Sequence, residues 1–288
     1  MTAFDQSDLP DTPDTEPNDQ ATPIIAVLGA GKIGEALMSG LLHGGHTADE
    51  LLFTERHPER AAELTETYGI RGVEIEEAAQ RADVLVVAVK PQDIEPLLET
   101  LAPLGASGQL VVTLCAGLPT SLFENRLGDV PVVRVMPNTP MVVGEAMSAI
   151  SAGAYATPEH MATVEKMLSC VGQVVELPET QLNAVTALSG SGPAYFFYLV
   201  EAMIDAGILL GLPRAIAEKL IIQSAVGSAK MLLDSDAHPV ILREAVTSPA
   251  GTTINAIREL EKHGVRAALL AAIEAARDRA VELGKAHE

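Results

Sequence analysis

The spacing of hydrophobic residues changes partway along this chain. From residue 23 to residue 178, short apolar runs alternate with longer stretches in which apolar residues recur at helical spacing. Strands alternating with helices indicate βαβ units and a doubly wound parallel sheet. Strands are predicted at 24–28, 51–54, 83–89, 110–114 and 130–136, followed by a small α/β piece at 147–175. We therefore predict an α/β N-terminal domain of Rossmann type over residues 23–178.

After residue 178 the alternation stops and helix follows helix. Helices are predicted at 180–188, 193–210, 213–233, 238–246, 251–262 and 265–284. This pattern predicts an all-α C-terminal domain over residues 179–288. Its most apolar stretch, from Tyr195 to Leu212, contains Glu201 and Asp205, which would be costly in lipid. We interpret this stretch as a buried helix of a soluble protein.

Composition narrows the class of protein. Of the 288 residues, 48% are apolar and 20% are charged, which is typical of a globular chain. The net charge of −20 disfavours nucleic acid and anionic membranes as partners. Residues 1–22 hold six carboxylates and no Lys or Arg, which predicts a disordered acidic tail. The chain has only two cysteines and does not start with a signal-like segment, so we expect it in the cytoplasm. Its seven histidines are scattered, so we expect no metal site.

A glycine-rich segment follows the first predicted strand and opens a helix. One glycine permits the tight turn, the second lets the backbone approach a pyrophosphate, and the third lets the helix pack on the strand. The strand, the helix and the distance to the second strand agree with a dinucleotide-binding loop. Its residues are Gly29, Ala30, Gly31, Lys32, Ile33 and Gly34.

The end of the second strand carries conflicting signals about the nicotinamide cofactor. Glu55 is placed to hold a ribose diol, which favours NAD. Arg56 follows it, and a guanidinium suits a 2′-phosphate, which favours NADP. Arg56 and Arg60 can equally be solvated surface residues. Lys90, which follows the strand predicted at 83–89, is a candidate cation beside the cofactor or a lysine without a role.

Two further segments precede helices in the second half. The run from Ser248 to Thr253 exposes backbone N–H groups at a helix start and can bind a carboxylate, although its hydroxyls can equally be ordinary helix caps. The run from Ser189 to Gly192 is predicted to be a flexible loop. It is not a hydrolase elbow, because that motif requires Gly at position 189.

Together these blocks resemble the pyrroline-5-carboxylate reductase family over residues 23–284. The resemblance rests on GAGKIGEAL at 29–37, AVKPQD at 88–93, RVMPNTP at 134–140, ALSGSGPAYFF at 187–197, GLPR at 211–214, SAKMLL at 228–233 and SPAGTTINAI at 248–257. It implies a Rossmann-type domain, a helical domain that forms dimers or rings of dimers, and an active site completed by a neighbouring subunit. Three positions depart from the family pattern: Glu55, Ile75, and Ala250, where a second glycine is usual.

The resemblance also implies roles for individual residues. The implied cofactor contacts are the loop 29–34, Glu55, Arg56, Ala88, Val89, Lys90, Pro91, Cys115, Ala116 and Gly117. The implied substrate contacts are Glu179, Ser248, Ala250, Gly251, Thr252 and Thr253. Among these, Thr253 and Glu179 are the candidate catalytic residues, and Thr252 is expected to act mainly in helix capping.

The implied reaction is hydride transfer from NADPH, with NADH as the alternative, to the cyclic imine of 1-pyrroline-5-carboxylate, giving L-proline. A β-hydroxyacid dehydrogenase is one rival. Those enzymes carry a catalytic Lys with Asn four residues later, whereas Lys219 is followed there by Gln223 and Lys230 by Asp234. A non-catalytic dinucleotide-sensing protein is the second rival, and the nearly intact 248–253 segment disfavours it.

Overall fold

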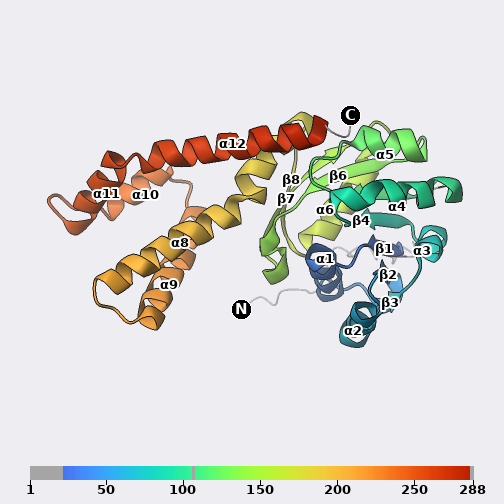
Figure 1. The fold of residues 1–288 in the computed structure, drawn as a ribbon, viewed down its shortest axis with the longest axis horizontal. Coiled ribbons are helices and arrows are strands. Elements are labelled where there is room, and N and C mark those ends of the chain that lie inside the picture. Colours follow the sequence, from blue (N-terminus) through green and yellow to red (C-terminus); the bar gives the residue numbers. More distant parts are fainter. Residues whose placement is uncertain (1–21, 106–107, 286–288) are drawn as a thin grey trace, which may run out of the picture.

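A computed structural model describes residues 22–105 and 108–285 of the chain. The predicted acidic tail therefore lies almost entirely outside the described residues. Figure 1 shows two parts, a sheet with helices around it and a helical arm that extends away from the sheet. The predicted fold class, a Rossmann-type α/β domain followed by an all-α domain, is confirmed.

The sheet has eight strands in the order β3-β2-β1-β4-β5-β6-β7-β8. Adjacent strands from β3 to β6 pair in parallel, β7 runs antiparallel to β6, and β8 is parallel to β7. The piece predicted at 147–175 thus extends this sheet rather than standing apart. The strands are β1 (Ile25–Leu28), β2 (Leu51–Thr54), β3 (Arg71–Gly72), β4 (Val84–Val87), β5 (Leu110–Thr113), β6 (Val132–Met136), β7 (Ala146–Ala152) and β8 (Gly172–Glu176).

Helices cover both faces of the sheet, because the central strands are apolar on both sides. Along β1, Val27 faces one apolar core and Leu28 faces the other, and both are fully buried. The first core includes residues of α1 (Lys32–His43), α2 (Pro58–Tyr68) and α6 (Pro158–Ser169). The second includes residues of α3 (Ile75–Arg81), α4 (Ile94–Leu101) and α5 (Thr120–Leu127).

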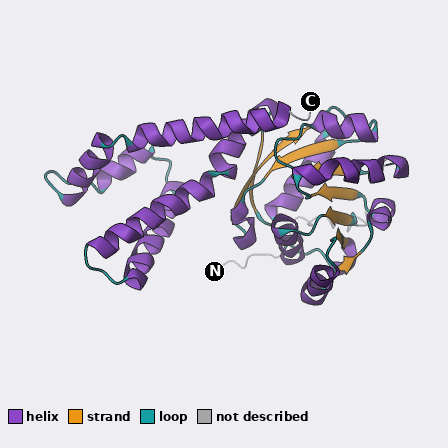
Figure 2. Ribbon diagram, viewed as in Figure 1, coloured by secondary structure: helices purple, strands orange, loops and turns teal. Residues whose placement is uncertain are grey.

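The helical arm begins just after the last strand, with a 3₁₀ turn at Glu179–Gln181. Figure 2 shows it as helices joined by short loops, and Figure 1 shows α8 leading away from the sheet and α12 returning to it. Its helices are α7 (Leu182–Val185), α8 (Gly192–Leu209), α9 (Arg214–Leu233), α10 (Pro239–Ala245), α11 (Thr252–Lys262) and α12 (Val265–Lys285).

The prediction of a flexible loop at Ser189–Gly192 is wrong. Residues Thr186–Gly190 form a π-helical turn that leads through Ser191 into α8. The Ser191 N–H donates to the Thr186 carbonyl at 2.8 Å, and the Ser189 hydroxyl donates to the Val185 carbonyl at 3.3 Å. These i to i+5 and i to i−4 bonds keep the small residues in a helical path.

The prediction that the 195–212 stretch is buried is wrong for the single chain. Helix α8 has no buried residue, and Phe197 and Tyr198 are 65% and 72% exposed. The helical stretch Glu179–Leu209 is long and apolar enough to cross a membrane by length and composition. Glu201 and Asp205 within α8 argue for a protein partner instead, because exposed apolar faces of this size mark interaction surfaces.

We expect the arm to be covered by a second copy of the chain. Sedimentation at micromolar concentration should give a dimer or a multiple of dimers, and the melting temperature should rise with protein concentration. Phe197→Asp, which places a charge on the exposed apolar face, should weaken that association, whereas Thr65→Asp, which adds the same charge at an exposed position of α2, is the charge control. A stable wild-type monomer would contradict this prediction.

Candidate functional site

The glycine loop joins β1 to α1 and is enclosed by the two neighbouring strands. The N–H groups of Gly29 and Ala30 both donate to the Thr54 carbonyl at 3.2 Å, at the end of β2. Gly29 has φ +103°, and an added Cβ would lie 3.0 Å from the backbone of Ala88 and Val89 beyond β4. Only glycine satisfies both the positive φ and this close approach.

The other two glycines of the loop have the roles that the motif predicts, one in helix packing and one in leaving the loop open. A Cβ on Gly34 would lie 2.3 Å from the Gly29 carbonyl oxygen, so the absence of a side chain lets α1 pack on the loop. A Cβ on Gly31 would meet nothing within 4 Å, so this side of the loop is open. Gly31 is the N-cap of α1 and supplies no side-chain cap. The first-turn N–H groups are therefore available to an anion.

The loop lies at the point where the strand order reverses, which is the usual ligand site of open α/β sheets. Strands β1, β4 and β5 are parallel neighbours, so their carboxyl ends meet at one edge. The structure thereby brings together most of the predicted cofactor contacts. The residues at this edge are Gly29, Ala30, Gly31, Lys32, Ile33, Gly34, Ala88, Val89, Lys90, Pro91, Cys115, Ala116 and Gly117.

Arginine side chains near the end of β2 are all paired with carboxylates. Both terminal nitrogens of Arg56 donate hydrogen bonds to the Asp93 carboxylate, at 3.1 and 3.3 Å. Arg60 binds Glu63 at 2.7 Å and also pairs with Glu35 of α1. Arg60 therefore ties α2 to α1, which is a structural contact.

Glu55 is the acidic residue at the position expected to bind a ribose diol. Its carboxylate accepts the His57 N–H at 3.0 Å, just before α2 begins. The Glu55 side chain thus supports the local turn, which leaves a ribose contact as an untested prediction.

Cys115 belongs to this edge through its backbone rather than its thiol. Its side chain is 2% exposed, and its Sγ donates to the Val89 carbonyl at 3.3 Å. Burial raises the pKa of the thiol to about 11. The thiol is therefore protonated at neutral pH and is unsuited to nucleophilic chemistry.

Glu179 holds the start of the arm against the sheet. Its carboxylate accepts the Thr120 N–H at 2.9 Å and the Thr120 hydroxyl at 3.0 Å, at the start of α5. Arg134 of β6 donates to the same carboxylate at 3.0 Å, and the Arg134 side chain is only 7% exposed. Three of roughly four acceptor positions on the carboxylate are thus occupied. This geometry makes Glu179 a positioning residue, and direct substrate contact stays a prediction.

Two further contacts join the arm to the carboxyl edge. The Asn138 side chain donates to the Ser189 carbonyl at 3.2 Å and accepts the Met147 N–H at 2.9 Å. At the end of α12, a Cβ on Gly284 would lie 3.2 Å from the carbonyl oxygen of Gly117. The sequence reasoning assigned no role to Thr120, Arg134 or Asn138. A charged residue inside an apolar strand was the available signal for Arg134, because such a charge needs a partner.

The 248–253 segment connects α10 to α11. Gly251 is the N-cap of α11 and Thr252 is its first residue, without a side-chain capping bond, so the expected capping role of Thr252 is wrong. Ala250 adopts φ +56°, in the left-handed region that favours glycine. This explains why glycine suits position 250 and shows that the turn persists with Ala there. Ser248 and Ala250 are exposed, and Thr253 is half-buried.

A single chain does not bring this segment to the glycine loop. Figure 1 places α10 and α11 at the end of the arm far from the sheet, whereas Glu179 is hydrogen-bonded to Arg134 of β6. The two candidate catalytic residues are therefore separated in one chain. The expected site requires the arm of another subunit.

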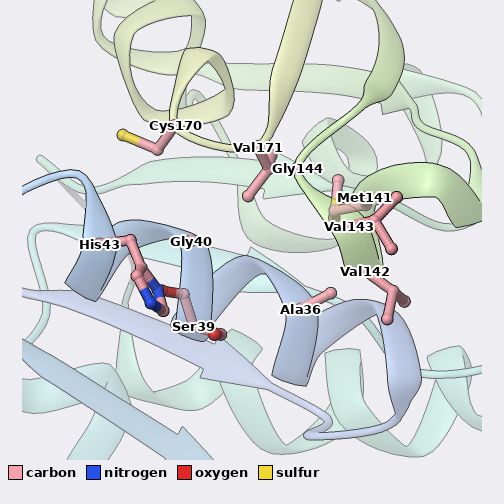
Figure 3. A pocket seen from close by; sticks show the side chains of 10 residues that line it. All are labelled: Ala36, Ser39, Gly40, His43, Met141, Val142, Val143, Gly144, Cys170 and Val171. Atoms are coloured by element: carbon pink, nitrogen blue, oxygen red, sulfur yellow. The ribbon is translucent and has the colours of Figure 1, made fainter.

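A separate pocket of about 320 Å³ lies between α1 and the 139–144 turn (Figure 3). Cys170 and Val171 line its remaining side, and His43 of α1 is also among the lining residues. None of the predicted site residues lines this pocket. Within the described residues, no group of three or more His, Cys, Asp or Glu side chains is placed to hold a metal.

Comparisons with known proteins agree with this geometry. Residues 179–283 match the family profile "Pyrroline-5-carboxylate reductase dimerisation", and residues 24–117 match "NADP oxidoreductase coenzyme F420-dependent". A pyrroline-5-carboxylate reductase of Mycobacterium tuberculosis is 44% identical over 90% of this chain and 96% of its own. That of Corynebacterium melassecola is 46% identical over 91% of this chain and 98% of its own. The chain belongs to the pyrroline-5-carboxylate reductase family.

Solved structures of pyrroline-5-carboxylate reductases share the whole fold. That of Coxiella burnetii superposes with a TM-score of 0.86 at 35% identity, covering 91% of this chain and 99% of its own. A Plasmodium falciparum pyrroline carboxylate reductase with NADP bound has a TM-score of 0.83 at 28% identity, covering 91% and 98%. The resemblance to the pyrroline-5-carboxylate reductase family is thus confirmed over both domains.

The buried thiol gives a direct test of the geometry at Cys115. Because its pKa lies near 11, Cys115 should resist iodoacetamide at pH 8 in the folded protein, whereas the half-buried Cys170 should react first. Mass spectrometry of the digested protein locates the modified thiol, and urea-unfolded protein is the positive control. The raised pKa also adds stability below pH 9 that is lost as the pH rises toward 11. Rapid labelling of Cys115 at pH 8 would contradict its burial.

Glu179→Ala should destabilise the protein by about 2 to 4 kcal/mol, because it leaves the buried Arg134 unpaired and removes the acceptor for Thr120. Urea unfolding measures this loss. Glu179→Gln keeps an oxygen acceptor for Thr120 and should lose less. If Glu179→Gln retained full stability but lost nearly all turnover, the carboxylate would have a catalytic role beyond positioning.

Proposed function

We propose that this protein reduces the C=N bond of 1-pyrroline-5-carboxylate to give L-proline, with NADPH as the hydride donor. The supporting observation is the open glycine loop at the strand-order reversal, in a chain that carries the family's dimerisation domain. Arg56 at the end of β2 favours NADPH over NADH, because a guanidinium matches a phosphate in charge and geometry.

The residues at the carboxyl edge fit a nicotinamide dinucleotide. The free N–H groups at the start of α1 would bind the pyrophosphate, with Gly31 leaving room for its approach. Residues 88–91 and 115–117 would line the path of the cofactor along the edge. When bound, the reduced nicotinamide supplies a hydride, and the protein supplies position and electrostatics.

The substrate is an anion, and the chain carries a net charge of −20, so local donors must hold it. The turn at Ser248, Ala250 and Gly251 leads into α11, whose first-turn N–H groups, from Thr252 onward, can bind the carboxylate, and Thr253 adds a hydroxyl. The Gly251 N–H itself donates to the Ser248 carbonyl at 3.1 Å. The Thr253 hydroxyl can hydrogen-bond a carboxylate oxygen or the ring nitrogen. A cyclic imine can be protonated before hydride arrives, so no strong protein acid is required.

The complete site is formed by two chains. The arm of one subunit brings its 248–253 turn to the carboxyl edge of another, because one chain holds these regions apart. The working unit is therefore a homodimer or a larger assembly of dimers. We expect it in the cytoplasm, with neither nucleic acid nor membrane as a partner.

A spectrophotometric assay tests the proposal. Loss of NADPH absorbance on addition of pyrroline-5-carboxylate, with proline identified as product, is the expected result. A β-hydroxyacid dehydrogenase would instead oxidise hydroxy acids with NADP, and a sensing protein would bind nucleotide without turnover. Either outcome would contradict the proposed function.

Thr253→Ala should lower kcat/KM for pyrroline-5-carboxylate by roughly ten- to a hundred-fold, because a hydrogen bond to a charged group contributes about 1.5 to 3 kcal/mol. NADPH affinity should be nearly unchanged, since Thr253 is proposed to contact the substrate, whereas the cofactor pyrophosphate is proposed to bind the first-turn N–H groups of α1. Thr252→Ala is the matched control, and its effect on turnover and stability should be small. If Thr252→Ala lost activity while Thr253→Ala kept it, the roles within the turn would be reversed.

A further inference from the structure

An ion pair bridges the two segments on either side of the glycine loop. Strands β2 and β4 flank β1, and the chain reaches Arg56 just after β2 and Asp93 just after β4. The Arg56 guanidinium binds both Asp93 carboxylate oxygens, at 3.1 and 3.3 Å. The pair therefore crosses the end of β1, where the dinucleotide loop begins.

Arg56 is the cation at this edge whose position suits a 2′-phosphate. In Rossmann folds the ribose 2′ position lies at the end of the second strand, where an Arg accommodates the phosphate of NADP. Arg60 is already held by Glu35 and Glu63 on the helix side. The Arg56 side chain is 77% exposed, whereas Asp93 is 27% exposed, so Arg56 is the partner free to move.

We propose that Asp93 is a specificity-determining residue, which competes with the cofactor's 2′-phosphate for Arg56 and so restrains the preference for NADPH over NADH. This inference rests on the proposed function. An exposed ion pair is weak and readily exchanged, while a guanidinium binds a phosphate dianion in bidentate fashion. Once Arg56 turns to the phosphate, the Asp93 carboxylate is left without its partner and beside a new negative charge. Both effects penalise the phosphorylated cofactor alone.

Equilibrium binding tests this without turnover. The dissociation constants of NADP⁺ and NAD⁺ are measured by titration calorimetry on the full chain at low salt. Asp93→Asn should tighten NADP⁺ binding by about two- to five-fold, which corresponds to the usual strength of an exposed ion pair, and leave NAD⁺ unchanged. Glu95→Gln is the matched control, because it removes a nearby carboxylate that pairs with Arg126 instead. It should change neither constant.

A double variant shows whether Asp93 acts through Arg56. In the Arg56→Ala background, Asp93→Asn should no longer alter NADP⁺ binding appreciably. If Asp93→Asn folds poorly, Asp93→Ala, which also removes the carboxylate, serves for the same comparison.

Two results would overturn the inference. Asp93→Asn could weaken the binding of NADP⁺ and NAD⁺ equally, which would show that the ion pair has only a structural role, or it could leave the NADP⁺ dissociation constant unchanged. If one of these two results were found while the wild type still reduced pyrroline-5-carboxylate with NADPH, only the inference about Asp93 would fail. A wild type that bound neither NADP⁺ nor NAD⁺ would overturn the proposed function as well.

Discussion

The buried guanidinium of Arg134 dictates where the helical arm starts. Arg134 lies in β6 between apolar neighbours, and a charge so far from water requires a partner within hydrogen-bond distance. Glu179 is that partner, and it also accepts from the backbone and hydroxyl of Thr120. The chain must therefore return from β8 to the carboxyl edge before it can leave as an arm. The Asn138–Ser189 hydrogen bond and the approach of Gly284 to Gly117 join the same edge to the arm. The end of the arm that is attached to the sheet thus lies beside the loops that would bind the cofactor, and the far end of the arm extends away from the sheet.

That arrangement explains why the arm is apolar on several faces. A helix hairpin that packs only on itself exposes large side chains to water, and α8 has none buried in the single chain. The same residues would become interior when another chain covers them. Under the proposed function, the same association would also complete the site. An enzyme built this way does not need its two candidate site regions to be close within a subunit. It needs the arm to have a fixed origin, which the contacts of Glu179 provide.

The sequence predicted those features that depend on local residues. Continuous apolar runs such as Val84–Val87 identified the buried strands, and the glycines at 29, 31 and 34 identified the loop because each steric demand is set by adjacent backbone. Helix α5 was not predicted, since only Thr120 and Phe123 of its residues are buried and its periodicity is weak. The Glu179–Arg134 contact joins residues 45 positions apart, and no local pattern specifies which carboxylate a buried arginine will reach. The π-helical turn at 186–190 begins within the helix predicted at 180–188, but its last residues, Ser189 and Gly190, were predicted to be a loop because serine and glycine are typical of loops.

A strongly acidic protein that binds anions has a particular electrostatic problem. The chain has 19 basic and 39 acidic side chains, and both arginines just after β2, Arg56 and Arg60, are paired with carboxylates. Arg60 is paired with Glu35 and Glu63, and its contact with Glu35 ties two helices together. Backbone N–H groups avoid this competition, because their position is set by the fold and no side chain needs to be displaced. The pyrophosphate and the substrate carboxylate are accordingly assigned to helix N-termini at Gly31 and Gly251. In the proposed function the 2′-phosphate depends on a charged side chain, that of Arg56, so cofactor preference is the property most open to adjustment by a nearby carboxylate.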